Sequence, residues 1–254
     1  MRKLIIALAI VLLATLKTSA SAAEIRALVA TAMKTSIDEL APQFEGKTGH
    51  KLRIIYGPSG TLTKRISDGE VADFAILGAE GYQELTTQSK ILAGSGVTIA
   101  VAKIGVAVPK GAAKPDISST EAFKIALLAA KSIAYVNPAS GGSSAVYLTR
   151  VFETMGIAEV LKAKTKLAAG GPNGYAGVFA ANGEAEIAMQ MMPELMAVSG
   201  IDIVGPLPGE FQNVTTYVAS IPSNAQEMEG AQTLISFLVT PTSAQLFKMK
   251  GMYD

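Results

Sequence analysis

The chain has no cysteine, no tryptophan, one histidine (His50) and no excess of charge, with 22 Lys and Arg residues against 21 Asp and Glu residues. The lack of cysteine excludes a thiolate nucleophile, a disulfide framework and a cysteine-bound zinc site, and one imidazole argues against a His-based triad. Balanced charge argues against nucleic-acid binding, and 49% hydrophobic residues exclude a disordered chain. We therefore expect no catalytic residue, no metal and no cofactor.

Long apolar runs are also absent, except at the N-terminus. Residues 1–3 carry two basic side chains, residues 4–16 are almost wholly apolar, and residues 18–23 are small and contain an A-x-A site at 20–22. This pattern is typical of a secretory signal peptide. The apolar run is shorter than the roughly 20 residues that span a bilayer, which favours cleavage over an uncleaved anchor. We predict a signal peptide over residues 1–23 and a weakly acidic, soluble, periplasmic mature protein.

The first part of the mature chain alternates predicted strands and helices, as in βα units around a mostly parallel sheet. Strands are predicted at residues 25–29, 52–56 and 73–77, and helices at 35–45 and 61–67. Apolar residues at 37, 40, 41 and 44 follow the helical period. Pro42 lies inside that helix and is expected to kink it.

The rest of the chain repeats this alternation after one long apolar strand. Strands are predicted at 97–108, 132–136, 186–191, 201–204 and 215–220, and helices at 120–128, 144–155 and, as the terminal helix, 225–238. No low-complexity linker separates the two sets of units, which favours two lobes that share a hinge. We predict an α/β fold of two lobes, each a mixed sheet flanked by helices. Lobe 1 comprises residues 24–103 and 210–254, and lobe 2 comprises residues 104–209.

Two loops between a strand and a helix are candidate anion sites. Residues 57–61 (GPSGT) contain Ser59 and Gly60, and residues 137–144 (NPASGGSS) contain Ser143 and Ser144. The first N–H groups of a helix have no partner inside the helix and carry the positive end of its dipole, so a neighbouring hydroxyl completes a cradle for an anion. The alternative is that these hydroxyls only cap their helices. One such loop in each lobe favours an anion-binding cleft.

Four further polar residues are candidates for ligand selectivity: Thr31, Lys34, Asn173 and Gln190. Lys34 can pair with a carboxylate or phosphate, or remain a solvated surface residue. Asn173 lies in a glycine-rich segment and is a turn former as well as a candidate ligand contact. Gln190 lies in a methionine-rich run that is equally compatible with packing in the core.

Motifs that carry covalent chemistry are missing. The sequence contains no GxSxG, HExxH, GxxxxGK[ST] or GxGxxG motif. The candidate carboxylate pairs, Asp38 with Glu39 and Glu184 with Glu186, lie on predicted solvated faces. The sequence therefore offers dipoles and hydroxyl groups for binding and no pair of acids for catalysis.

Six segments together resemble one known family over nearly the whole mature chain. They are residues 30–35 (ATAMKT), 44–49 (FEGKTG), 56–62 (YGPSGTL), 68–73 (DGEVAD), 106–111 (VAVPKG) and 241–247 (PTSAQLF). In this order and spacing they are similar to the molybdate-binding periplasmic proteins of ABC importers. The resemblance implies the two-lobed type 2 periplasmic binding protein fold.

The resemblance also implies which residues contact a ligand. In that family two hydroxyl residues of the first lobe, backbone amides of the second lobe and a tyrosine hydroxyl bind the oxyanion. By position the second hydroxyl is Ser59, whereas the first falls at Ala32, followed by Met33, and the tyrosine falls near Met191. Two side-chain donors of the family pattern are thus missing. The predicted ligand-binding residues are Thr31, Ala32, Met33, Lys34, Ser59, Gly60, Ser143, Ser144, Asn173, Gln190 and Met191.

The function implied by the resemblance is capture of a small anion and its delivery to the permease of an ABC importer in the inner membrane. A molybdate- or tungstate-type oxyanion is the first expectation for the ligand. The alternative ligand is a small organic carboxylate, which Lys34 and the missing serine favour. The alternative role is that of a ligand-sensing protein for a membrane receptor. We expect a monomer that is not an enzyme and has no nucleic-acid partner.

Overall fold

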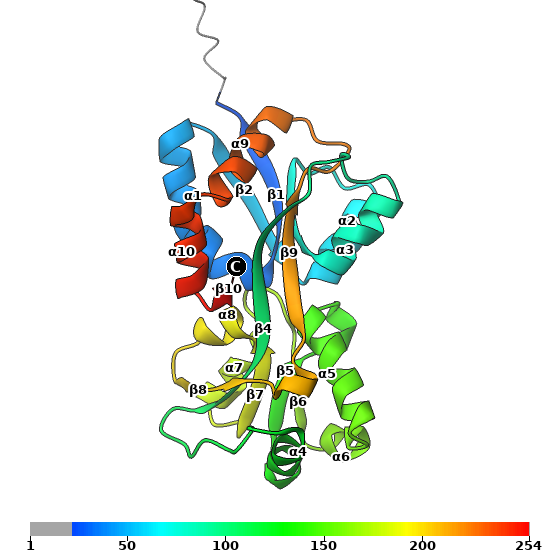
Figure 1. The fold of residues 1–254 in the computed structure, drawn as a ribbon, viewed down its shortest axis with the longest axis vertical. Helices are drawn as coiled ribbons and strands as arrows, with labels where there is room; N and C mark the ends of the chain where they lie inside the picture. Colours follow the sequence, from blue (N-terminus) through cyan, green and yellow to red (C-terminus); the bar gives the residue numbers. More distant parts are fainter. Residues whose placement is uncertain (1–21, 254) are drawn as a thin grey trace, which may run out of the picture.

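The computed structural model describes residues 22–253 and gives them an α/β fold, as predicted (Figure 1). The predicted signal peptide, residues 1–23, lies outside the described residues apart from its last two positions. Within the described range, eight strands form one continuous hydrogen-bonded path with a mixed sheet at each end, and two further strands pair with β4 beside this path. The two sheets meet at strand β4 (Val97–Pro109).

The first sheet contains both parallel and antiparallel strands. Its order is β2 (Lys51–Gly57), β1 (Glu24–Ala30), β3 (Phe74–Gly78), β9 (Val214–Ser220) and β4, with β10 (Met252–Tyr253) also paired to β4. Strand β1 pairs in parallel with β2 and β3, whereas β9 is antiparallel to β3 and β4. Parallel neighbours need a crossover connection, and helices supply it here.

The second sheet has the same mixed character. Its order is β4, β7 (Ile187–Met191), β5 (Ile133–Val136) and β6 (Thr165–Ala168), with β8 (Ile201–Pro206) also paired to β4. Strand β5 is parallel to β6 and β7, and β4 is antiparallel to β7 and β8.

Strand β4 changes partners halfway along its length. Residues 97–103 pair with β9, and residues 104–109 pair with β7 and β8. Figure 1 shows β4 and β9 running between the upper and lower halves of the molecule. We propose that the boundary between the lobes lies at this change of partner. Lobe 1 then comprises residues 24–103 and 210–254, and lobe 2 comprises residues 104–209. We call the upper half lobe 1 and the lower half lobe 2.

Helices cover the sheets of both lobes. In lobe 1 they are η1 (Thr31–Met33), α1 (Lys34–Thr48), α2 (Ser59–Ser67), α3 (Ala79–Thr87), α9 (Met228–Leu238) and α10 (Pro241–Met249). In lobe 2 they are α4 (Thr120–Ala129), η2 (Pro138–Ser140), α5 (Ser143–Thr154), α6 (Ala158–Lys162), α7 (Gly177–Ala181) and α8 (Met192–Met196), and η3 (Gly209–Phe211) follows β8. No helix within residues 22–253 is both long and apolar enough to cross a membrane.

Some predicted boundaries were wrong. Helix α1 continues past Pro42 to Thr48, and the predicted terminal helix begins at Met228 and is followed by α10. The start of α10 has a local cause, because the Thr240 side chain accepts a hydrogen bond from the Ser243 N–H and proline occupies the first turn. Helix α3, strand β6 and the short helices α6 to α8 were not predicted. The short elements span too few residues to show a hydrophobic period.

The main hydrophobic core extends through both lobes. One cluster contains Phe44 and Phe74 from lobe 1 together with Phe123 from lobe 2, and all three rings are almost fully buried. Fully burying a phenylalanine side chain contributes about 1.5–3 kcal/mol. One apolar cluster therefore runs through both lobes and includes residues of the strands that connect them.

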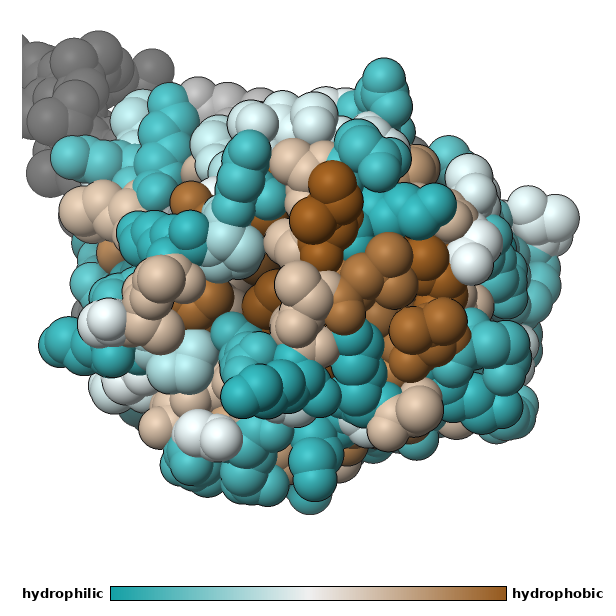
Figure 2. Space-filling model, turned by 90° about the horizontal axis from the view of Figure 1, so that it is seen from below, coloured by the Kyte–Doolittle hydropathy of each residue, from teal (hydrophilic) through white to brown (hydrophobic). Residues whose placement is uncertain are grey.

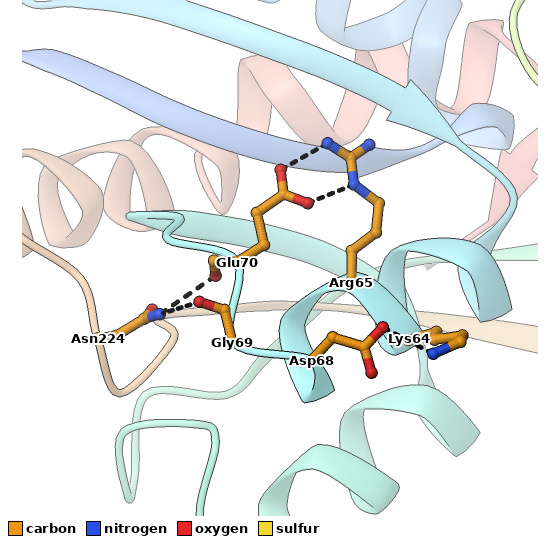
Figure 3. A network of polar contacts seen from close by, with 6 residues as sticks. All are labelled: Lys64, Arg65, Asp68, Gly69, Glu70 and Asn224. Carbon is orange, nitrogen blue, oxygen red and sulfur yellow. Dashed lines mark hydrogen bonds and ion pairs between the residues drawn. The ribbon is translucent and has the colours of Figure 1, made fainter.

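A polar network fixes the end of α2 that lies away from the lobe interface (Figure 3). The Arg65 guanidinium donates two hydrogen bonds of 2.5 Å to the Glu70 carboxylate, and Lys64 pairs with Asp68 at 2.7 Å. The Asn224 amide donates to the carbonyl oxygens of residues 69 and 70. Bidentate arginine pairs are among the stronger polar contacts. This network ties the C-terminal end of α2 to the segment that follows it and to Asn224.

Candidate functional site

The carboxyl ends of the parallel strands in both lobes lead into the same region. Strands β1 and β2 end at Ala30 and Gly57 in lobe 1, and β5 ends at Val136 in lobe 2. Helices η1 and α1, α2, and α5 begin just after these ends. In open α/β sheets, ligands bind beyond the carboxyl ends of the strands. The fold therefore directs the starts of three helical segments toward one place between the lobes.

A small inner pocket lies at this place and encloses about 30 Å³. Lobe 1 and the hinge strand contribute Ala30, Thr31, Ala32, Pro58, Ser59 and Tyr217, and lobe 2 contributes Val136, Gly142, Ser143, Ser144, Gly170, Gly171, Met191 and Glu194. One water needs about 10–15 Å³ measured in this way. The inner pocket has room for a carboxylate group or a small oxyanion. None of the described residues that line it is Lys, Arg or His.

Thr31 supplies a hydroxyl group that has no partner within the described part of the chain. Its side chain is only 4% exposed, lines the inner pocket, and has no hydrogen bond to its Oγ1 atom. Leaving a buried polar group unpaired costs about 1–3 kcal/mol. A ligand that accepts a hydrogen bond from Thr31 would recover this cost.

Ser59 is positioned by the strand next to it. Its Oγ atom accepts a hydrogen bond of 2.7 Å from the Gly78 N–H at the end of β3. That contact uses an acceptor site of the hydroxyl and leaves its proton available to donate. Because Ser59 is also the first residue of α2, it lies at the positive end of that helix dipole. Both features favour an anion next to Ser59.

Lobe 2 contributes the N-terminus of α5. The helix begins at Ser143, and the first N–H groups of a helix have no acceptor inside it. The Ser143 hydroxyl interacts with the hydroxyl of Tyr217 on β9, which links α5 to the hinge strand. Burial raises the pKa of Tyr217, and the charge of Glu194 raises it further. Tyr217 therefore remains a neutral hydroxyl group in the pocket.

The two lobes touch beside the pocket through one backbone hydrogen bond and one side-chain hydrogen bond. The Gly60 N–H donates to the Gly141 carbonyl oxygen at 3.0 Å, and the Thr61 hydroxyl donates to the Ser140 carbonyl oxygen at 2.7 Å. A Cβ atom on Gly60 would lie 2.9 Å from the Gly141 oxygen, and Gly141 itself has a positive φ of 72°. Only glycine at both positions permits this close approach. We call this contact the lobe latch.

Glu194 places a carboxyl group in the wall of the inner pocket. It is 8% exposed, and burial raises its pKa to about 7, although hydrogen bonds from the Gln190 side chain and the Met191 backbone lower it. Gln190 is itself 1% exposed, and its Oε1 atom accepts a 2.7 Å hydrogen bond from the Ala176 N–H. Burial, followed by the charges of Glu194 and Asp38, raises the pKa of Tyr175 to about 12.

A larger outer cavity adjoins the inner pocket and shares Ser59 and Ser143 with it. It encloses about 330 Å³ between α2 and α3 of lobe 1 and α5 of lobe 2. Its lining includes charged groups, namely Arg150, Glu80 and Glu84. Arg150 is exposed, and its guanidinium forms no ion pair or hydrogen bond with another residue in the range 22–253. The outer cavity is therefore wide and charged.

The structure brings together six of the predicted ligand-binding residues in the inner pocket. They are Thr31, Ala32, Ser59, Ser143, Ser144 and Met191. Gly60 lies next to them in the lobe latch and lines the outer cavity. Ala32 has no hydroxyl group, but it belongs to the helical turn that begins beside the pocket, where backbone N–H groups are available.

The other four predicted residues lie outside the inner pocket. Met33 is fully buried in the core, and Asn173 is exposed. Gln190 is buried, and its side chain donates a hydrogen bond to Glu194. Lys34 forms an ion pair with Asp38, and its Nζ atom lies 4.8 Å from the centre of the Tyr56 ring. Asp38 also accepts a 2.7 Å hydrogen bond from the Tyr56 hydroxyl, and burial is the first cause that raises the pKa of Tyr56. Lys34 is thus engaged within lobe 1.

Three residues of this region were not predicted from the sequence: Tyr217, Glu194 and Arg150. Tyr217 lies inside an apolar strand, where nothing in the local pattern separates a pocket residue from a core residue. Glu194 follows β7 at the start of α8, the kind of strand-to-helix junction that was used to find Ser59. Arg150 lies seven residues after Ser143 on α5, and the helical period places both on one face. These two signals were present in the sequence.

No group of three or more His, Asp or Glu side chains within residues 22–253 has the arrangement of a metal site. The donors that line the inner pocket are hydroxyl and backbone N–H groups, and these suit an anion. The prediction that the protein carries no metal or cofactor stays a prediction.

Comparison with known proteins gives one family for this chain. The family model for bacterial extracellular solute-binding proteins matches residues 25–253. An aconitate isomerase from Pseudomonas sp. is 34% identical over 223 residues, which cover 85% of this chain and 82% of that protein. The molybdate-binding protein ModA of Azotobacter vinelandii is 28% identical over 98% of this chain and 96% of its own length.

Solved structures agree with the family at the level of the fold. The periplasmic molybdate-binding protein of Azotobacter vinelandii superposes with a TM-score of 0.73 and 23% identity, over 91% of this chain and 99% of that one. The sulfate-binding protein SubI of Mycobacterium tuberculosis gives 0.71 and 15%, over 91% and 86%. The two-lobed fold and the resemblance to molybdate-binding proteins are confirmed. The chain belongs to the bacterial extracellular solute-binding proteins.

Proposed function

We propose that this protein captures a small anion in the inner pocket between its lobes and delivers it to an ABC importer. The observation that carries the proposal is the donor set of that pocket. The Thr31 hydroxyl has no hydrogen-bond partner among the described residues, and the Ser59 hydroxyl keeps its proton free to donate. Both hydroxyl groups lie beside the starts of helices from both lobes. Such donors favour negative charge without a cationic side chain.

The number of donors is sufficient for tight binding. A micromolar dissociation constant corresponds to about 8 kcal/mol, and a hydrogen bond to a charged group contributes about 1.5–3 kcal/mol. About four such bonds supply this free energy. The Thr31 and Ser59 hydroxyl groups and the N–H groups of Ser143 and Ser144 are the candidates. Helix dipoles add only about 0.3–2 kcal/mol each.

A tetrahedral oxyanion such as molybdate or tungstate is the first candidate ligand. The inner pocket is small, uncharged on its donor side and shared by both lobes, which suits a compact ion that the lobes enclose by hinge closure. The relatives named as molybdate-binding proteins support the same class.

A small organic carboxylate is the second candidate ligand, and two observations favour it. The relative named aconitate isomerase matches at higher identity than the molybdate-binding relatives do. The inner pocket also adjoins a much larger cavity that holds Arg150, so that one carboxylate group of a ligand could occupy the inner pocket and the rest could extend outward. The same relative makes isomerase activity the alternative to transport. Incubation of the protein with cis- and trans-aconitate, followed by chromatography, tests that alternative, because turnover would replace the binding role.

The family supports a location for this protein, and its surface supports a protein partner. Extracellular solute-binding proteins act outside the cytoplasmic membrane, and the N-terminal pattern supports a cleaved signal peptide and a periplasmic location. We propose that the mature protein is a monomer. Figure 2 views the free end of lobe 2 and shows apolar residues gathered on part of that face. Exposed apolar side chains of lobe 2 include Ile125 and Leu128 on α4 and Val160 on α6. Apolar surface of this kind supports a protein partner, for which we propose the permease.

A ligand-sensing role would use the same lobes with a different partner. Crosslinking the protein to membranes of its source cell and identifying the captured protein separates the two roles. An importer permease supports delivery for transport, whereas a membrane receptor supports sensing.

Thermal unfolding against a panel of anions tests the proposed function. Molybdate, tungstate, sulfate, citrate and trans-aconitate are each added to the mature protein. A ligand at 100 times its dissociation constant stabilises the folded state by about 2.7 kcal/mol. We expect molybdate or tungstate to raise the melting temperature most. Stabilisation by a tricarboxylate alone would replace the oxyanion by the carboxylate, and no stabilisation by any anion would contradict the proposal.

A further inference from the structure

Glu194 is the one carboxyl group among the described residues that line the inner pocket. It lies on α8, directly after strand β7, and its side chain is almost completely buried. All other polar side chains that line this pocket are hydroxyl groups. A carboxylate there would repel the anion that the hydroxyl and N–H groups attract. The arrangement requires an explanation.

The groups that bind the Glu194 carboxyl group are neutral donors. On its own segment, the Gln190 amide and the Met191 N–H donate hydrogen bonds to it. From the neighbouring elements, the hydroxyl groups of Tyr175 and Tyr217 experience its charge, and Asp38 acts on Tyr175 from α1. The lining of the inner pocket adds no Lys, Arg or His in the described range. Glu194 is thus bound by neutral donors, and no cationic side chain lines the pocket with it in the described range.

We infer that Glu194 is a proton-linked contact of the bound anion: its carboxylate takes up one proton from solvent when the anion binds, and the resulting O–H group donates a hydrogen bond to the anion. This inference rests on the proposed function. The proton comes from water or buffer, forms the O–H bond on the Glu194 carboxylate, and stays there until the anion leaves.

The direction of the pH dependence follows from electrostatics. Burial raises the pKa of Glu194 to about 7 in the free protein, and a bound anion at hydrogen-bond distance raises it further. Above about pH 7 the free protein has lost this proton and the complex has kept it, so binding takes up a proton and the affinity falls as pH rises. The dissociation constant then increases by up to tenfold per pH unit. Below about pH 7 both states are protonated and Glu194 adds no pH dependence.

The experiment compares wild type, Glu194→Gln and Glu80→Gln by calorimetric titration with molybdate and, separately, with trans-aconitate. Titrations run from about pH 7 to about pH 9, where both probes are ionised. A glutamine amide donates a hydrogen bond at every pH, so we expect Glu194→Gln to bind with a nearly constant dissociation constant and no linked proton. Wild type should weaken toward tenfold per pH unit. Glu80→Gln changes an exposed carboxylate of the outer cavity and should retain the wild-type slope.

Titration in two buffers with different heats of ionisation measures the proton directly. We expect wild type to take up close to one proton near pH 8 and Glu194→Gln to take up none. Equal slopes and equal proton uptake in wild type and Glu194→Gln would overturn the inference while leaving anion binding intact. A failure of wild type to bind either probe at any pH would instead overturn the proposed function and the inference with it.

Discussion

The inner pocket and the outer cavity lie side by side and share Ser59 and Ser143, yet they differ in almost every physical property. The inner pocket is small and is lined by buried or half-buried hydroxyl groups, and burial raises the pKa of its one carboxyl group. The outer cavity is about ten times larger by volume, and its charged groups include the exposed Arg150, Glu80 and Glu84.

This difference indicates where the affinity comes from. A hydrogen bond to an anion gains strength where water is excluded, because the local dielectric is low. An exposed charge is screened and contributes about 0–1 kcal/mol. We therefore expect the uncharged inner pocket to determine affinity and the charged outer cavity to adjust it only slightly. Four substitutions test this comparison.

Ser59→Ala is expected to have the largest effect. It removes a donor that faces the anion and also leaves the Gly78 N–H without its acceptor. Loss of one charge-assisted hydrogen bond costs about 1.5–3 kcal/mol, which corresponds to a loss of affinity of about tenfold to a hundredfold. The melting temperature of the free protein should fall as well.

Titration calorimetry and thermal unfolding measure both effects of Ser59→Ala. Ser67→Ala, at the other end of α2, is the matched control, because its hydroxyl contacts Gln88 at an exposed site. It should change neither property. An unchanged affinity in Ser59→Ala would place the ligand elsewhere.

Gly60→Ala tests the lobe latch and is expected to have the next largest effect. The new Cβ atom would lie 2.9 Å from the Gly141 oxygen, so the closed arrangement must shift. Overpacking of this kind costs about 1–3 kcal/mol, and the cost falls on the closed state that holds the ligand. Affinity should drop about tenfold or more, while the free protein gains from alanine in a helix.

The matched control for the latch is Gly46→Ala in α1, where no atom lies within 4 Å of the new Cβ position. It should stabilise the protein in the same way and leave affinity unchanged. Equal affinities for Gly60→Ala and wild type would show that the latch has no part in ligand capture.

Thr31→Val separates binding from stability. The valine keeps the shape of threonine and removes a buried hydroxyl that has no partner in the described residues. We expect affinity to fall about tenfold, whereas the free energy of unfolding of the free protein should stay the same or rise by about 1 kcal/mol.

Ser36→Ala is the control for Thr31→Val, because Ser36 also has a buried hydroxyl without a partner but does not line the inner pocket. It should affect stability in the same direction and leave affinity unchanged. If both substitutions change affinity equally, Thr31 has no specific role in the site.

Arg150→Ala is expected to have the smallest effect and distinguishes the two ligand classes. For molybdate, which fits the inner pocket, an exposed charge in the outer cavity should change affinity by less than about fivefold. For a tricarboxylate that extends into the outer cavity, the loss should be clearly larger and should shrink as salt is added. A large loss of affinity for molybdate would contradict the claim that the inner pocket determines affinity and the outer cavity adjusts it only slightly.

Much of the fold was predictable because short stretches of the sequence determine its strands and turns. Strands β1, β2 and β5 carry apolar runs, and the turns after them carry glycine and serine, so the junctions that hold Ser59 and Ser143 could be found. Predicted boundaries of these elements agree with the structure to within about two residues. Helix α10 was missed although Thr240 and Pro241 give a start signal.

The side-chain environment was less predictable, because it depends on tertiary contacts. The position of Lys34 near a helix start made it a reasonable candidate for contact with an anion. In the structure it forms an ion pair with Asp38, which lies one helical turn away. Tyr217 enters the pocket only because β9 lies between β3 and β4. Glu194 is distinguished by its burial, which cannot be read from the sequence.

The crystal structure of a complex tests the central claim most directly. The protein would be crystallised with the anion that raises its melting temperature most. We predict electron density for an anionic group in the inner pocket, within hydrogen-bond distance of the Thr31 and Ser59 hydroxyl groups and of the N-terminus of α5. An anion bound only to Arg150 in the outer cavity, with water alone beside Thr31, would contradict this account.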